Sequence, residues 1–491
     1  MRIPYSFKDL DSIYEKLVRK SQMSFRKKRY NRCVKCIAAA AHLQYYYNHI
    51  YTDKRLNNLL RDLSSVLFDR VEETYNSNTV IFYDSFCWDN RGLTQHYLDA
   101  LVSTNHYRII LISEHPLDEK GNDIKKYIED NDIELYTLPN EGWREQAYYV
   151  YNIIKRVKPC AALFHLTPAT VIPFLAFNAF PSIRKYQINL TDHAFWLGDE
   201  EFFDYSYEFR DYGVTVSLEK RGFRKEQLIL NPYYPWQSDT PFQGFPISTE
   251  GKVVLFSGGS MYKTEGEDGM YFFLLKQVLD KHPTTVFFYA GTGNSAHFES
   301  FIKDNHYQDR VFLIGNRKDI NAVFQHCDIY ISTYPLIGGL MTQYAAMNAK
   351  SILVYNKPEI EALVSIKGKV SFNCSTISEY LNEADKLICD IEYRVMRGAQ
   401  LQSALITQDD FRRQFSATFI KDSERVVKPI LSIIDYEDFS NSYISRINSG
   451  SISIERVLIG SMFVHWKIVL NSVLQLPKMF KKVINKYFRL G

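Results

Sequence analysis

The sequence predicts an α/β protein with two doubly wound, Rossmann-like domains, an added N-terminal helical segment and a C-terminal amphipathic helical tail. Strand-like apolar runs alternate with helical runs from Thr79 to Leu190, and the alternation resumes from Lys252 to Cys389. Nearly continuous apolar strands of this kind are typical of parallel sheets covered on both faces. Residues 231–250 lie between the two runs, are rich in Pro, Gly, Ser and Thr, and lack periodicity, which indicates a linker. A chain of 491 residues is long enough for two or three domains.

The order of apolar runs and turn residues predicts each element in turn. In the first domain the predicted strands are 79–83, 107–112, 133–138, 161–165 and 185–190, and the predicted helices run from 90 to 101, 123–129, 143–157 and 168–177. In the second domain the predicted strands are 252–256, 285–289, 311–314, 329–331 and 352–355, and the predicted helices are 270–279, 320–327, 340–348 and 378–389. These runs give four segments, with bounds 1–75, 76–235, 250–425 and 440–491.

The first 75 residues have helical spacing throughout and contain a basic cluster. Residues 32–50 and 55–68 carry apolar side chains three and four positions apart. The cluster 26–29, together with Arg32, predicts a solvated helix face, with contact to anionic lipid or to nucleic acid as alternatives. Cys33 and Cys36 form a lone pair with no second pair at zinc-ligand spacing, so we expect them on a helix surface and not in a metal site.

Composition narrows the class of protein. The chain is 46% hydrophobic and 23% charged, which are ordinary globular values. Its seven cysteines are an odd and scattered set, which predicts reduced thiols in a cytosolic protein. The first sixteen residues have no apolar core, so no signal peptide is expected, and no uncharged apolar run is long enough to span a bilayer. We therefore expect a soluble or peripheral protein.

The most specific stretch of the chain runs from Asp328 to Tyr355. A strand-like run ends at Ser332, a glycine pair follows at Gly338 and Gly339, and a helical run and a second strand come after it. The first turn of such a helix offers free backbone N–H groups and the positive end of the helix dipole, which suit a phosphate. The stretch therefore predicts a nucleotide-phosphate site.

Two doubly wound domains joined by one linker resemble the GT-B glycosyltransferases that use nucleotide sugars, of the family 4 and family 1 type. The glycine turn at Gly258–Gly259, the run Arg310–Thr333 and the glycine pair with its helix are similar to the nucleotide-sugar half of that group. The resemblance implies that 76–235 is the acceptor domain, that 250–425 is the donor domain, and that a cleft lies between the two sheets. It implies no cofactor and no metal.

The resemblance also implies roles for particular residues. Lys263 stands where many retaining members have a lysine that stabilises the leaving diphosphate, and we take it as catalytic and donor-binding. The remaining predicted donor-binding residues are Gly258, Gly259, Arg317, Tyr334, Gly338, Gly339, Leu340, Gln343 and Glu361.

Two positions depart from the family pattern. Gly258 stands where an arginine is expected, so either another residue, Arg317 or Lys318, supplies the second positive charge or the affinity for phosphate is weak. Taken alone, Arg317 is expected to be a surface charge. Tyr344 stands where a carboxylate often holds the ribose, and Glu361 is the nearest acid that could replace it.

Three groups of residues follow strand ends or turns elsewhere. Asp192 and His193 come just after a strand of the first domain and are the second pair of predicted catalytic residues, with one of them as base if the enzyme inverts configuration. Asn90, Arg91 and Gly92 are predicted on the acceptor side. The sequence 130–132 has the letters of a metal-binding DxD, but it lies in a helix-to-strand turn and is expected to be solvated.

The last residues concentrate positive charge. Apolar side chains at 479, 480, 483, 484, 487 and 488 fall on one helical face, and basic ones occupy the rest. A basic amphipathic helix over 478–490 predicts an anchor on an anionic membrane surface, with packing on the chain's own first domain as the alternative. We expect a cytoplasmic protein, peripheral on the inner face of the cell membrane, with no nucleic-acid partner; a homo- or hetero-oligomer is compatible with the sequence.

The resemblance therefore implies a metal-independent hexosyl- or N-acetylhexosaminyltransferase. The donor would be a nucleotide diphosphate sugar, UDP-linked, and the acceptor a glycan, a lipid-linked molecule or a protein; the resemblance, and not the residues, implies a place in bacterial surface polysaccharide or glycoconjugate synthesis. One alternative is a weak or inactive GT-B subunit that binds acceptor or stabilises an active transferase. A further alternative is a CDP-polyol phosphotransferase.

Overall fold

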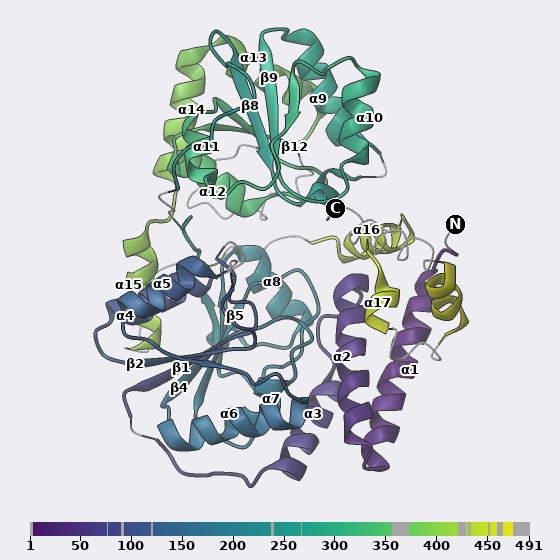
Figure 1. Ribbon diagram of the computed structural model, residues 1–491, viewed down its shortest axis with the longest axis vertical. Helices are drawn as coiled ribbons and strands as arrows, with labels where there is room; N and C mark the ends of the chain where they lie inside the picture. The colour runs from purple at the N-terminus through teal and green to yellow at the C-terminus, as the bar shows by residue number, and fades with distance from the viewer. Residues whose placement is uncertain are drawn as a thin grey trace, which may run out of the picture. The chain divides into compact units, whose positions relative to one another are not determined.

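The computed structural model of the chain consists of two compact units (Figure 1). Unit 1 comprises Met1–Glu208, Gly213–Leu230 and Asp435–Gly491, and unit 2 comprises Phe209–Tyr212 and Asn231–Ile434. The structure describes residues 3–75, 77–89, 93–118, 121–236, 240–266, 268–355, 373–420, 429, 431, 434–449, 452–458 and 465–474. The cleft between the two sheets stays a prediction.

Unit 1 contains a seven-stranded, wholly parallel sheet in the order β3-β2-β1-β4-β5-β6-β7. The strands are β1 Thr79–Asp84, β2 Arg108–Ser113, β3 Glu134–Thr137, β4 Ala161–His165, β5 Arg184–Asn189, β6 Tyr205–Glu208 and β7 Leu228–Leu230. The chain adds β2 and β3 on one side of β1 and then β4 to β7 on the other, so β1 and β4 flank a topological switch point. The predicted doubly wound domain is confirmed.

The helices of this sheet follow the predicted order with local differences. They are α4 Thr94–Ser103, α5 Asn122–Asp130, α6 Trp143–Val157, α7 Ile172–Phe177 and α8 Asp211–Lys220. Helix α7 begins at Ile172 and not at residue 168, because the preceding residues form a turn in which Thr170 N–H donates to the Thr167 carbonyl. The sequence analysis did not anticipate β6, α8 and β7, because these elements are short or mix polar with apolar residues.

Three N-terminal helices extend unit 1, as the sequence predicts for residues 1–75. They are α1 Phe7–Arg26, α2 Tyr30–Tyr47 and α3 Lys54–Leu67, and α1 and α2 lie side by side (Figure 1). Helix α1 starts at a capping box in which the side chains of Ser6 and Asp9 bond each other's backbone N–H groups. Cys33 and Cys36 are 0% and 2% exposed, so their predicted place on a helix surface was wrong. Residues three apart share one face, and here it is the face that packs inward.

Helix α3 fastens this helical segment to the sheet domain. The Asn57 side chain both accepts from Gly198 N–H and donates to the Gly198 carbonyl, each at 3.0 Å. The Ser64 hydroxyl donates to the Leu175 carbonyl on α7 at 2.7 Å. The N-terminal helices are therefore part of the folded body of unit 1.

The described part of the predicted C-terminal tail also packs in unit 1. It contains α16 Tyr436–Ser449 and α17 Ile454–Leu458, and residues 465–474 follow. The Tyr5 hydroxyl donates to Glu455, the Lys467 ammonium pairs with Asp9 at 2.6 Å, and the side-chain amide oxygen of Asn471 accepts from Ile3 N–H. The predicted anchor, 478–490, lies outside the described residues. No described helix combines the length and the apolar character needed to cross a bilayer.

Unit 2 contains a six-stranded parallel sheet in the order β10-β9-β8-β11-β12-β13. The strands are β8 Val253–Gly258, β9 Thr285–Ala290, β10 Val311–Leu313, β11 Ile329–Ile331, β12 Ser351–Tyr355 and β13 Asn373–Cys374. The direction of strand addition reverses between β8 and β11, so these two strands flank the switch point of the second sheet.

Helices cover both faces of this second sheet (Figure 1). They are α9 Met270–Lys281, α10 Ala296–Asp304, α11 Ile320–Gln325, α12 Gly339–Met347, α13 Ile377–Cys389 and α14 Ile391–Ser403. Unit 2 also contains α15 Gln408–Phe419. Leu255 of β8 belongs to one apolar cluster with α9, α10 and α13, whereas its neighbours Val254 and Phe256 belong to another with α11, α12 and α14. Alternate side chains thus face opposite layers, as the predicted double winding requires.

Candidate functional site

The two predicted glycine turns meet at one edge of the second sheet. β8 and β11 pair in parallel register, with Leu255 opposite Ile329 and Phe256 opposite Tyr330, so their carboxyl ends lie next to each other. Gly258 and Gly259 end the first of these strands, and Gly338 and Gly339 follow the second. Ligands of open α/β sheets bind at the carboxyl edge beside the switch point, which is this position.

Helix α12 starts at this edge without a side-chain cap. Its N-cap residue is Gly338, which has no side chain to accept from the first-turn N–H groups. Such groups, together with the helix dipole, suit an anionic ligand oxygen. Leu340 follows in the first turn and is half-buried, whereas Gly338 is buried. Tyr334 lies earlier in the loop, where its ring packs edge-on against Tyr355 at 5.2 Å between centroids.

Lys263 lies between the two turns. It belongs to a short 3-10 helix, Met261–Thr264, directly after the glycines of β8, and it is half-buried. A Cβ built at Gly259 would lie 3.6 Å from Lys263 Cδ, so the lysine stem runs alongside this glycine. The Lys263 carbonyl accepts from Leu336 N–H at 3.4 Å, which joins the lysine turn to the loop before α12. The segments that carry Gly258, Gly259, Lys263, Tyr334, Gly338, Gly339 and Leu340 therefore lie at one edge of the sheet, and the binding of a donor by these residues stays a prediction.

The structure gives a physical reason for glycine at position 258. This residue ends the buried strand β8, and was predicted in the turn after it. A Cβ there would lie 2.8 Å from both the Ala290 carbonyl oxygen and Met341 Cε. A side chain as large as the arginine that the resemblance implies does not fit, so any second cation has to come from another position.

Two residues of α12 donate hydrogen bonds to main-chain carbonyls of the segment 233–236. Gln343 is fully buried, and its amide donates to the Tyr233 carbonyl at 2.5 Å. The Tyr344 hydroxyl donates to the Trp236 carbonyl at 2.8 Å. Both side chains fasten the segment that enters unit 2 at Asn231. The predicted contact of Gln343 with the donor stays a prediction.

Arg317 has a structural role in this arrangement. Its guanidinium pairs with Asp319 at 2.6 and 2.7 Å and also donates to the Gly244 carbonyl at 2.8 Å, and its side chain is only 7% exposed. Although burial opposes ionisation of Asp319, this pairing holds the pKa of that carboxyl below its usual value. Lys318 is exposed. Glu361, the predicted ribose acid, lies outside the described residues, as do Asn90, Arg91 and Gly92 on the predicted acceptor side.

The predicted pair Asp192 and His193 follows β5 in unit 1. Asp192 is fully buried, and its carboxylate lies 3.4 Å from His193 Nδ1, whose side chain is 28% exposed. The guanidinium of Arg221 donates to the carbonyls of Asp192 and Ala194 at 2.9 and 2.6 Å and so fixes this turn. Only His193 of the pair reaches the surface, with Asp192 behind it to orient the ring.

A second polar cluster lies at the switch point of the first sheet, and the sequence analysis missed it. Asp84 ends β1 and His165 ends β4, and the two are paired in register with Nδ1 and the carboxylate 3.1 Å apart. Burial opposes ionisation of Asp84, but His165 and hydrogen bonds from Thr94 and the Phe86 N–H hold its pKa below the usual value. His165 Nε2 is buried and has no hydrogen-bond partner within the described chain.

Glu114 adds a third titratable group to this edge. It follows β2, is half-buried, and accepts from the Tyr83 hydroxyl at 2.8 Å. Burial, with a smaller contribution from the Asp84 charge, raises the pKa of Glu114 to about 7. The signal that could have revealed the cluster is a polar residue directly at the end of each of three apolar strands.

The described residues offer no group of three or more His, Cys, Asp or Glu side chains placed to hold a metal ion. The DxD-like letters fall where α5 ends at Asp130, and Asp132 is exposed with a φ of 51°. The predicted solvated turn is confirmed at this position.

Comparison with solved structures identifies the fold. A Thermobaculum terrenum O-GlcNAc transferase mutant superposes with a TM-score of 0.50 at 12% identity, over 83% of this chain and 78% of that one. Anabaena Alr3699/HepE in complex with UDP and glucose superposes with a TM-score of 0.52 at 12% identity, over 70% of this chain and 99% of that one. The chain therefore has the GT-B fold that the sequence predicts. No protein-family model and no curated protein sequence matches it.

The raised pKa of Glu114 predicts a loss of stability with rising pH. Between its ordinary pKa of 4.5 and about 7, the folded protein keeps a proton that the unfolded chain has released. The free energy of unfolding should therefore fall by about 2 kcal/mol across this range. Glu114→Gln should remove most of that fall in urea titrations at pH 5 and pH 7, whereas exposed Glu141→Gln should not. An equal pH dependence in wild type and Glu114→Gln would contradict the assignment.

Proposed function

We propose that the protein is a glycosyltransferase that moves a sugar from a nucleotide diphosphate donor, a UDP-sugar, to an acceptor. The observation that carries the proposal is the donor-side edge of unit 2, where an uncapped helix start and a glycine turn flank a lysine at the switch point. A diphosphate needs close backbone approach, N–H donors and a positive charge, and this edge offers all three. The solved structure of Anabaena HepE with UDP supports the choice of nucleotide.

The chemistry proposed for this edge is stabilisation of the leaving group. As the bond from the sugar to the diphosphate breaks, negative charge grows on the phosphate oxygens. The Lys263 ammonium and the N–H groups at the start of α12 would compensate that charge, so the proposed reaction needs neither a metal nor a cofactor. If configuration is retained, the leaving phosphate can take the acceptor proton. If it is inverted, His193, oriented by Asp192, is the proposed base.

The acceptor and setting follow from the resemblance and from sequence patterns. We propose a glycan, lipid-linked or protein acceptor and a hexosyl or N-acetylhexosaminyl group as the transferred sugar. We also propose a role in bacterial surface polysaccharide or glycoconjugate synthesis. The basic amphipathic pattern of 478–490 supports a cytoplasmic protein held on the inner face of the cell membrane.

A second candidate function is a GT-B subunit without transferase activity. Tyr344 occupies the position where a ribose-binding acid is expected, and its hydroxyl is engaged with the Trp236 carbonyl. Gly258 leaves no room for the expected arginine. Both observations favour weak nucleotide binding and a partner role. A CDP-polyol phosphotransferase is a third candidate, and it predicts a preference for CDP over UDP.

The donor-site proposal predicts thermal stabilisation by UDP. A ligand at one hundred times its dissociation constant should add about 2.7 kcal/mol to the free energy of unfolding. Gly339→Val places a branched side chain where the phosphate should approach and should weaken UDP binding at least about tenfold, or 1.4 kcal/mol. The matched control is Gly142→Val, at the N-cap of α6 in unit 1. No stabilisation of the wild type by UDP or CDP would favour the subunit without activity, and tight UDP binding by folded Gly339→Val would move the site elsewhere.

Lys263 should matter for turnover more than for folding. Lys263→Ala removes one cation from the leaving diphosphate and should lower kcat about a hundredfold, while the melting temperature stays close to that of the wild type. Lys263→Arg should recover part of the rate because the charge is kept. Lys303→Ala, at an exposed position on α10, should leave turnover unchanged. Near wild-type turnover of Lys263→Ala with a UDP-sugar and a competent acceptor would exclude this role.

A further inference from the structure

We propose that the hairpin formed by α1 and α2 is a docking surface for a membrane leaflet that carries anionic phospholipids. The surface lies on described, folded residues of unit 1. It is separate from the predicted anchor at 478–490, and it does not depend on the donor site or on transferase activity.

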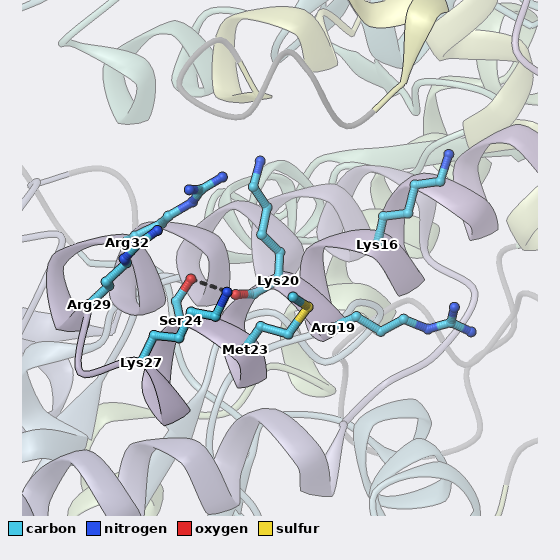
Figure 2. Close-up of a pocket in the computed structure, with 8 residues that line it drawn as sticks. All are labelled: Lys16, Arg19, Lys20, Met23, Ser24, Lys27, Arg29 and Arg32. Atoms are coloured by element: carbon cyan, nitrogen blue, oxygen red, sulfur yellow. Dashed lines mark hydrogen bonds between the residues drawn. The ribbon is translucent and has the colours of Figure 1, made fainter.

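A hollow of about 460 Å³ on this hairpin is lined almost entirely by cations (Figure 2). Six of its eight lining residues are basic: Lys16, Arg19, Lys20, Lys27, Arg29 and Arg32. The other two are Met23 and Ser24, and the Ser24 hydroxyl donates to the Lys20 carbonyl at 2.6 Å. Among the described residues, none that lines this hollow carries a carboxylate.

A second hollow of about 590 Å³ continues the same surface. It shares Arg29 and Arg32 with the first and adds Lys28, Lys35 and Arg144, with Glu145 as its one acid. The two hollows together present nine cationic side chains and one carboxylate, although the whole chain has a net charge of only +3. Positive charge is thus concentrated on this hairpin.

The cations of this surface are not held in ion pairs. None of the nine forms an ion pair with another described residue, and all but the half-buried Lys20 are exposed. Glu15, the acid on α1 nearest in sequence to Lys16, is paired with Arg55 at 2.8 Å. A surface of unpaired cations produces a strong positive potential and attracts anions.

The extent of the surface favours a membrane over a small anion. Lys16 on α1 and Lys27 at the C-cap of the same helix are eleven residues apart, which corresponds to roughly 17 Å. The side chains of Lys16, Lys20 and Arg32 extend in the same direction in Figure 2. A single phosphate compound can contact only a few of these groups, whereas a plane of lipid phosphates can meet several cations of the surface at once.

The apolar and aromatic side chains favour lipid over nucleic acid. Met23 lines the first hollow among the cations and is 54% exposed. Burying such an apolar side chain at the headgroup boundary of a membrane is favourable. Single-stranded nucleic acid is usually held by free aromatic faces on which bases stack. Here the Trp143 N–H is bonded to Asn31 at 2.9 Å with Arg144 over the ring, and the Tyr30 ring packs on Phe25.

The test is vesicle co-sedimentation of the full-length protein. The vesicles contain phosphatidylcholine alone or phosphatidylcholine with phosphatidylglycerol, and salt is varied. The triple variant Lys20→Glu, Arg29→Glu, Arg32→Glu should bind the anionic vesicles at least about tenfold more weakly than the wild type. The matched control replaces three exposed lysines elsewhere, Lys125, Lys126 and Lys303, by glutamate. In salt that screens the net charge of the protein, it should bind the anionic vesicles within about twofold of the wild type.

The same comparison is made in chains whose tail carries Lys481→Glu, Lys482→Glu and Lys486→Glu, so that the hairpin is measured apart from 478–490. UDP stabilisation and the melting temperature of the hairpin variant should match those of the wild type, which separates docking from donor binding and from folding. The proposal is overturned if the hairpin variant binds anionic vesicles as tightly as the control in both backgrounds. It is also overturned if the wild type does not bind anionic vesicles. This includes the case in which the wild type binds soluble polyphosphate or an RNA oligomer through these cations instead.

Discussion

The candidate site depends on the pairing of β8 with β11, two strands that lie about seventy residues apart in the chain. The Asp328 carboxylate accepts from Val254 N–H at 2.7 Å, and Asp328 N–H donates to the Val254 carbonyl at 2.9 Å, so the register of the pair is fixed where β11 begins. Parallel register then places the glycine turn of one strand beside the helix start of the other. Any slip of one residue would also turn Leu255 and Phe256 to the wrong helical layers.

This constraint explains which parts of the fold the sequence could predict. Strands buried on both faces are apolar at every position, and β1 and β4 were therefore found within about one residue of their observed bounds. Helix α10 and strand β7 were not found, because the first carries few buried side chains and the second has three residues. Their positions are decided by packing against the sheet and not by local pattern.

The residues of the candidate site also fall into those that local sequence could identify and those that it could not. A glycine turn between a strand and a helix is local, so Gly338–Gly339 could be identified from spacing alone. The Asp84–His165 pair could not, because β1 and β4 are neighbours in the sheet although β2 and β3 lie between them in the chain. Arg317 was misleading for a different reason. A carboxylate two residues away competes for its guanidinium, and the bidentate pair with Asp319 satisfies it.

The two leading functions differ in what they require of one face of α12. Gln343 and Tyr344 both donate to main-chain carbonyls of 233–236, the segment through which the chain enters unit 2. A side chain engaged in this way is held in one rotamer, and although its oxygen can still accept a hydrogen bond, it carries no negative charge to offer a ribose hydroxyl as a carboxylate would. An active enzyme must therefore bind the ribose through neutral acceptors or through other groups, and a subunit without activity has no such requirement. Gln343 and Tyr344, which hold the connecting segment, are accordingly the residues of α12 that distinguish an active enzyme from a subunit without activity. The start of the same helix suits a diphosphate in either case.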